Sequence, residues 1–227
     1  MVRRVVRLGG LAGVGLIWLL TAASTADAKE IYVNNQVGND QAAGTIDAPL
    51  RSARRAVATA TAGDVIHLLP DAAVYREMIT LADKRDLTIE GHECTVTGAD
   101  PLPADPARWE KVGDGLHRIQ LQRTIQNRHL LVVDGKGVTM GRTKYEIGRT
   151  DLRAQYPKLE DLRNGEFAWE PIDNGAGWLY VKGPLNKLEW AVRPQGIYTD
   201  KEVQNITIRN LHARHALNDG FNIHGNA

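Results

Sequence analysis

Short apolar runs bounded by Gly, Asp or Asn alternate with polar segments along most of the chain. In the first hundred residues these runs are three to five residues long and rich in β-branched side chains, at positions 31–33, 65–69, 78–81, 87–91 and 95–98. Runs of this length and composition predict strands rather than helices. Ile66 and Ile89, at the centres of the second and fourth runs, lie 23 residues apart. Short strands repeating at this spacing are typical of stacked coils.

One segment has helical periodicity instead. Leu50, Ala53, Val57 and Ala60 follow one another at steps of three, four and three residues, and Gly63 follows them. This spacing places the apolar side chains on one face and predicts a single amphipathic helix of about three turns.

The strand pattern returns near the C-terminal end, in segments 205–211 and 218–225. There, apolar and polar residues alternate with the period of two that a strand with one buried face requires. We expect the apolar positions to point inward and the polar ones outward; the first set is Ile206, Ile208, Phe221 and Ile223, and the second is Thr207, Arg209, Asn222 and His224.

Residues 101–198 differ from the rest of the chain in composition and in the pattern of apolar runs. Four of the chain's five Trp residues lie there, together with the strand-like runs 130–133, 166–169 and 178–181, and only 151–164 has a helical pattern. We therefore predict that 101–198 is an antiparallel β-rich insertion. It would separate an N-terminal cap and first coils, residues 29–100, from further coils in residues 199–227.

The first 28 residues have the three parts of a secretory signal peptide. Arg3, Arg4 and Arg7 precede an apolar run over 8–20, and Ala-Asp-Ala at 26–28 matches a cleavage site. We predict a secreted or periplasmic bacterial protein that is not membrane-associated once 1–28 is removed. The alternative is an uncleaved membrane anchor.

The charge balance argues against a nucleic-acid partner, and the cysteine content argues against a disulfide-held fold. Lys and Arg total 28 against 27 Asp and Glu, which leaves a formal net charge of +1. Such a balance gives no electrostatic footprint for nucleic acid. The single cysteine, Cys94, excludes an intramolecular disulfide, and we expect it to be a small buried apolar residue.

Several segments resemble a known family. The run 31–33 with its Asn/Gly-rich loop, the helical segment, and runs 62–66 and 87–91 resemble the N-terminus of right-handed parallel β-helix proteins. This is the pectate-lyase-like superfamily, which includes glycoside hydrolases and polysaccharide lyases. Segments 205–211 and 218–225 are similar to its repeating coils. The resemblance implies an all-β right-handed parallel β-helix with an N-terminal capping helix and an antiparallel β-rich insertion. It also implies that this chain is an N-terminal fragment.

Asp219 is the first catalytic candidate. Its Asn218-Asp219-Gly220 setting is similar to the Asn-x-Asp-Gly step of polygalacturonase-type hydrolases, which implies a catalytic acid or base. Hydrolysis of a glycoside needs a second carboxylate several ångströms away, and we expect that partner beyond Ala227. The alternative is a turn whose side chains bond the backbone.

Histidines and aromatic residues complete the predicted site. We predict His215 and His224 as catalytic residues beside Asp219, because a histidine can move a proton near neutral pH. The predicted substrate-binding residues are His212, Arg214, Asn222, Trp178 and Tyr180. The competing interpretations are solvent-facing histidines and, for Trp178 and Tyr180, the core of the insertion. The spacing enforces no metal site.

The predicted function is cleavage of polysaccharide by glycoside hydrolysis in an exported carbohydrate-active enzyme that needs no cofactor. A first alternative is β-elimination on uronates by a lyase, in which Arg209 or Arg214 would act as the base and a positive charge or Ca²⁺ would stabilise the enolate-like intermediate. A second alternative is a non-catalytic carbohydrate-binding or surface protein. In each case the expected partner is a polysaccharide or oligosaccharide.

Overall fold

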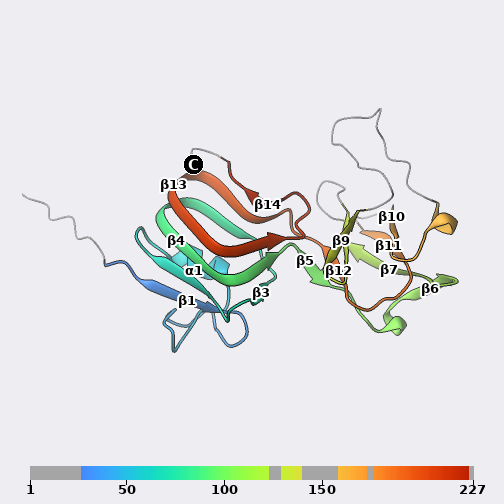
Figure 1. The fold of residues 1–227 in the computed structure, drawn as a ribbon, viewed down its shortest axis with the longest axis horizontal. Coiled ribbons are helices and arrows are strands. Elements are labelled where there is room, and N and C mark those ends of the chain that lie inside the picture. The colour runs from blue at the N-terminus through green and yellow to red at the C-terminus, as the bar shows by residue number, and fades with distance from the viewer. Residues whose placement is uncertain (1–26, 123–128, 140–157, 173–175, 225–227) are drawn as a thin grey trace, which may run out of the picture.

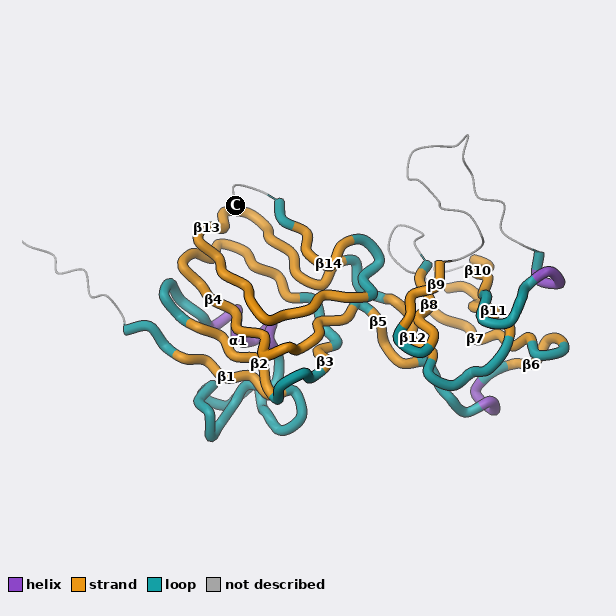
Figure 2. The backbone as a smooth tube through the Cα atoms, viewed as in Figure 1, coloured by secondary structure: helices purple, strands orange, loops and turns teal. Residues whose placement is uncertain are grey.

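The structure is a computed structural model that describes residues 27–122, 129–139, 158–172 and 176–224 (Figure 1). Nearly all of the predicted signal peptide, and residues 151–157 of the predicted helical segment, lie outside these ranges. Within them, no helix is both long and apolar enough to span a membrane. Most of the described chain is strand, with one short α-helix (Figure 2).

A six-stranded sheet holds the two ends of the described chain together. Its order is β1-β2-β4-β13-β14, with β3 also paired to β4, and every pairing is parallel. The strands are β1 Glu30–Asn34, β2 Val65–Leu69, β3 Val74–Tyr75, β4 Ile79–Thr97, β13 Gln195–Arg214 and β14 Asp219–Asn222.

Two four-stranded antiparallel sheets are formed by the chain between β4 and β13. One has the order β10-β11-β7-β6 and the other β5-β12-β8-β9. Their strands are β5 Ala99–Pro101, β6 Glu110–Gly113, β7 Leu116–Gln122, β8 Leu130–Val133, β9 Lys136–Thr139, β10 Phe167–Pro171, β11 Ala176–Lys182 and β12 Leu188–Ala191. Short 3-10 turns lie at Pro106–Arg108 and Leu159–Asp161.

The α-helix α1, Ala53–Thr59, is shorter than the three turns predicted. Its first turn is capped by the Ser52 side chain, which accepts a hydrogen bond from the backbone N–H of Arg55. At the other end Ala60 is already extended, and the Thr59 hydroxyl donates back to the carbonyl of Arg55. A threonine bonded in this way competes with continuation of the helix, so α1 ends before Gly63.

The predicted solenoid of short stacked coils is wrong. Runs 78–81, 87–91 and 95–98, expected as separate short strands, belong to the single 19-residue strand β4. Polar residues that were expected to end the strands instead bond across to β13: Lys201 donates to Asp83 at 3.0 Å and Asn205 donates to Asp86 at 2.9 Å. The described residues therefore form one parallel sheet and two antiparallel sheets, not a right-handed parallel β-helix.

In-register pairing builds the core of the parallel sheet. Ile31, Ile66 and Ile89 are direct neighbours on β1, β2 and β4, and each is at most 9% exposed. Ile208 pairs with Ile89 from β13 and is partly buried. Since residues paired in a parallel sheet point to the same face, these side chains stack in one apolar row. Cys94 is buried and free, as the sequence predicts.

The edge strand β14 departs from the sequence interpretation. Phe221 pairs with the fully buried Ile197, yet it is 45% exposed, and the nearby Ile223 is 55% exposed. In contrast Asn222, expected to face outward, is buried. Alternation predicted the strand correctly, but it could not show that β14 is the last strand of the sheet and has no described neighbour on its far side.

Removing apolar volume from the stacked row should destabilise the protein strongly. We expect Ile89→Ala to lower the free energy of unfolding by about 2–5 kcal/mol, because the cavity cannot collapse between three strands. Val37→Ala, at a side chain that is 75% exposed, should change it by no more than about 0.5 kcal/mol. Urea unfolding followed by circular dichroism measures both. Equal effects of the two substitutions would contradict the proposed core.

Candidate functional site

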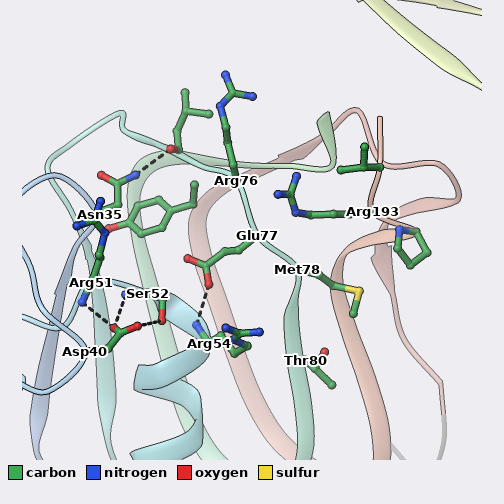
Figure 3. Close-up of a pocket in the computed structure, with 14 residues that line it drawn as sticks. Asn35, Asp40, Arg51, Ser52, Arg54, Arg76, Glu77, Met78, Thr80 and Arg193 are labelled. Carbon is green, nitrogen blue, oxygen red and sulfur yellow. Dashed lines mark hydrogen bonds between the residues drawn. The ribbon is translucent and has the colours of Figure 1, made fainter. Parts of the chain in front are cut away.

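A groove of about 900 Å³ lies where the return from the antiparallel sheets meets the start of α1 (Figure 3). Its volume is in the range of pockets that hold small molecules or a few sugar units. Four chain segments line it, with the residues Asn35, Asp40, Arg51, Ser52, Arg54, Val74, Tyr75, Arg76, Glu77, Met78, Thr80, Val192, Arg193 and Pro194.

Two carboxylates organise the wall formed by α1. Asp40 accepts hydrogen bonds from the backbone N–H groups of Arg51 and Ser52, at 2.9 and 2.8 Å, and from the Ser52 hydroxyl at 2.8 Å. Glu77 accepts from the backbone N–H groups of Ala53 and Arg54, at 3.0 and 2.9 Å. Both acids therefore serve N–H groups at the start of the helix that have no partner inside it.

The pKa values of the two carboxyl groups are shifted in opposite directions. Burial raises the pKa of Glu77, and the hydrogen bonds from Arg54 and Ala53 offset this only in part. Burial also opposes ionisation of Asp40, but hydrogen bonds from Ser52 and Arg51 outweigh it and hold its pKa below the usual value. A pair of acids with diverging pKa values is often found in catalytic sites. Here, however, both are engaged with backbone N–H groups, so we assign them a structural role.

Two arginines fix the opposite wall to the antiparallel sheets. Arg76 donates to the carbonyl of Ala99 and to the carboxylate of Glu189, both at 2.6 Å. Arg193 donates to both oxygens of Asp100, at 2.8 and 3.2 Å. These guanidinium groups are held in place by partners on β5 and β12, and their side chains stay 32% and 22% exposed.

Arg51 and Arg54 are the remaining basic residues of the groove. Both side chains are exposed, and neither makes an ion pair within the described part of the chain. The apolar lining includes Met78, Val192 and Pro194. The groove thus combines guanidinium donors with short apolar surfaces, which suits binding of a polar ligand more than proton transfer.

Asp219 does not lie in this groove. On β14, its Oδ2 accepts from the amides of Asn218 and Asn222, both at 2.5 Å. The Oδ1 of Asn222 is buried and has no hydrogen-bond partner among the described residues. No second carboxylate is bonded to this group in the described structure, so the predicted catalytic pair stays a prediction.

The predicted histidines and Arg214 are not brought together with Asp219 by any hydrogen bond in the described residues. His212 pairs with Glu93 at 3.1 Å, and the backbone N–H of His224 donates to the Thr199 hydroxyl. His215 has a left-handed backbone (φ 54°) just after β13, and Arg214 is the last residue of that strand.

Arg118 covers one side of the predicted sugar platform on β11. The guanidinium group of Arg118 lies 4.2 Å from the centre of the Trp178 ring and also donates to the Tyr180 hydroxyl. Tyr180 is 4% exposed and donates to Glu170 at 2.7 Å. A sugar stacking on Trp178 from that side would have to displace Arg118, so the ring does not offer a free face there.

A histidine chain was missed by sequence reasoning. His67 lies against Tyr32, with ring centres 4.9 Å apart, and its two nitrogens meet Glu30 and, at 2.9 Å, His92. His92 in turn lies 3.8 Å from Asp71. Both ring nitrogens of His67 are already hydrogen-bonded, so they are not free to bind a metal ion. No cluster of three possible metal ligands is found in the described ranges.

Comparisons with known proteins give one structural likeness. No family model and no curated protein matches the chain. The structure is similar to that of XylC, solved in complex with xylose, with a TM-score of 0.55 and 19% sequence identity. The similarity covers 79% of this chain and 34% of XylC, so the chain spans about a third of that protein's length. At this identity the likeness shows a shared fold and no more.

These findings correct the family resemblance drawn from the sequence. The short motifs at 31–33, 62–66 and 87–91 suggested the pectate-lyase-like β-helix superfamily, but no family model matches the chain. The described fold, one parallel and two antiparallel sheets, is instead similar to that of XylC. Motifs of three to five residues located apolar strand segments but defined neither where the strands end nor the family.

Removing the Asp40 carboxylate should destabilise the start of α1. We expect Asp40→Ala to cost about 1–3 kcal/mol, since three hydrogen bonds to a charged group are lost. The folded-state pKa of Asp40 lies below the unfolded one, so its contribution is present above about pH 4 and fades as the pH falls through the folded value.

Chemical denaturation from pH 7 down to pH 3 measures this effect. The difference between wild type and Asp40→Ala should shrink toward the acid end. Asp47→Ala, at an exposed residue without a hydrogen-bonded carboxylate in the described structure, is the control and should follow wild type. A difference that is constant across the range would contradict the assigned role of Asp40.

Proposed function

We propose that the protein binds saccharide in the groove between α1 and residues 192–194. The observation that carries the proposal is the lining of the groove, where positioned guanidinium donors lie beside apolar side chains. Sugars present hydroxyl groups in the ring plane and C–H groups on the ring faces, so they need both kinds of contact. The shared fold with a protein solved in complex with xylose supports a saccharide as the ligand class.

Blocking the groove should abolish this binding. Val192 is 39% exposed and lines the groove, so Val192→Trp should fill space there without disturbing the core. Isothermal titration of the full chain with xylotetraose, and with xylotetraose carrying a glucuronic acid branch, is the measurement. We expect at least one to bind to wild type and neither to Val192→Trp.

Val37→Trp is the matched control, because Val37 is more exposed and lies outside the groove. It should bind like wild type. Absence of binding by wild type to both saccharides would refute the proposed function, and unchanged binding by Val192→Trp would move the site elsewhere.

Hydrolysis of a glycosidic bond is a second candidate function. It is favoured by Asp219, whose carboxylate is held in one orientation by two side-chain amides. A carboxylate fixed in this way is oriented for a reaction with bound substrate. Lyase chemistry has less support, since Arg209, a candidate base, is paired with Glu90 at 2.6 Å.

Asp219→Asn tests the hydrolytic candidate. If Asp219 acts on substrate, release of reducing ends from xylan or polygalacturonate should fall about 100-fold or more, while Asp47→Asn should retain wild-type activity. Reducing ends accompanied by the ultraviolet absorbance of unsaturated products would indicate a lyase instead. Saccharide binding without either product would leave a non-catalytic binding protein.

A further inference from the structure

The groove holds more positive than negative charge that a ligand can reach. Its four arginines come from α1 and its approach (Arg51 and Arg54), from the link between β3 and β4 (Arg76), and from the return to β13 (Arg193). Its two acids, Asp40 and Glu77, direct their carboxylate oxygens at backbone N–H groups. A ligand entering the groove therefore meets guanidinium groups first.

The arginines differ in how they are held, and the difference assigns them roles. Arg76 and Arg193 are ion-paired with Glu189 and Asp100, so they shape the wall and their charges are largely compensated. Arg51 and Arg54 are exposed and have no ion-pair partner in the described ranges. The charge of Arg54 interacts with the Glu77 carboxylate but forms no ion pair with it. Each of the two exposed guanidinium groups presents planar donors that match a carboxylate or sulfate group.

We infer that the groove selects acidic saccharides, with Arg51 and Arg54 binding a uronate carboxylate or a sulfate ester. This inference rests on the proposed function and specifies its ligand class. Met78, Val192 and Pro194 contact the sugar rings in the groove, while the two arginines pair with the acidic substituent. The Glu77 carboxylate accepts from the backbone N–H of Arg54 at 2.9 Å and so fixes the start of the Arg54 side chain (Figure 3).

A matched pair of ligands tests the inference. Xylotetraose with a glucuronic acid branch should bind to the full wild-type chain about tenfold or more tightly than xylotetraose alone, which is the size expected of one charge-assisted contact. The preference should weaken as salt rises from low to physiological concentration, because exposed charges are screened.

Three single variants locate the effect. Arg51→Gln and Arg54→Gln should each reduce the preference for the acidic ligand about tenfold, because the branched saccharide loses a charge-assisted contact. Arg55→Gln is the matched control: Arg55 is exposed, belongs to the same helix and does not line the groove. It should behave like wild type. Circular dichroism should show that all three variants are folded.

The outcomes separate this inference from the proposed function. Equal affinity for both saccharides overturns the acidic preference while the saccharide-binding function stands. An acidic preference that survives in Arg51→Gln and Arg54→Gln overturns the role of these arginines. If inorganic sulfate binds as tightly as the branched saccharide, the selection of acidic saccharides is overturned too, because the groove would then bind anions in general. Binding of neither saccharide overturns both proposals.

Discussion

The parallel pairing of β4 with β13 is the constraint on which the rest of the structure depends. The two strands pair from Ile79 with Ile197 to Thr97 with Arg214, although about a hundred residues separate them in the chain. Closing so long a loop costs entropy that must be recovered along the whole strand pair. The same pairing brings the exit and the return of the antiparallel sheets together, where Arg193 binds Asp100 and the N–H of Val192 donates to the carbonyl of Gly98. Residues 192–194 therefore lie beside the link between β3 and β4, and the groove exists because of this closure.

Local periodicity was enough to predict where strands lie, but not how far they continue. The run 65–69 matches β2 and the run 130–133 matches β8, because apolar side chains alternate within each strand or fill it. The sequence wrongly predicted that strands end at Asp83 and Asp86, which both lie inside β4. Aspartate usually marks a turn, and both residues do have a left-handed backbone (φ 53° and 50°). Their side chains nevertheless bond to residues of β13 nearly 120 positions away. No single-sequence pattern carries that information.

The candidate site was harder to predict for a related reason. The sequence pattern places Arg51 and Arg54 on the solvent-facing side of an amphipathic helix. This predicts their exposure correctly but does not show that they line a groove. Their groove is completed by Val192 and Pro194, and nothing in the sequence near α1 points to that segment. The sequence candidate Trp178 shows the opposite difficulty. An aromatic ring suggested a sugar platform, but Arg118, its neighbour on β7, covers it at 4.2 Å. A residue type indicates what chemistry is available, while access depends on neighbours from other strands.

The carboxylates of Asp40 and Glu77 link stability to binding in this groove. Each oxygen that caps a backbone N–H of residues 51–54 helps hold the first turn of α1 and is directed at the backbone. The acids would otherwise lie among the arginines and neutralise them, as Glu189 and Asp100 do for Arg76 and Arg193. Because both acids bond the backbone, neither forms an ion pair with Arg51 or Arg54 in the described structure, although the charge of Arg54 interacts with Glu77. The same hydrogen bonds therefore cap the helix and position Arg51 and Arg54. A substitution that loosens the cap should also displace these arginines, which we assign to ligand binding.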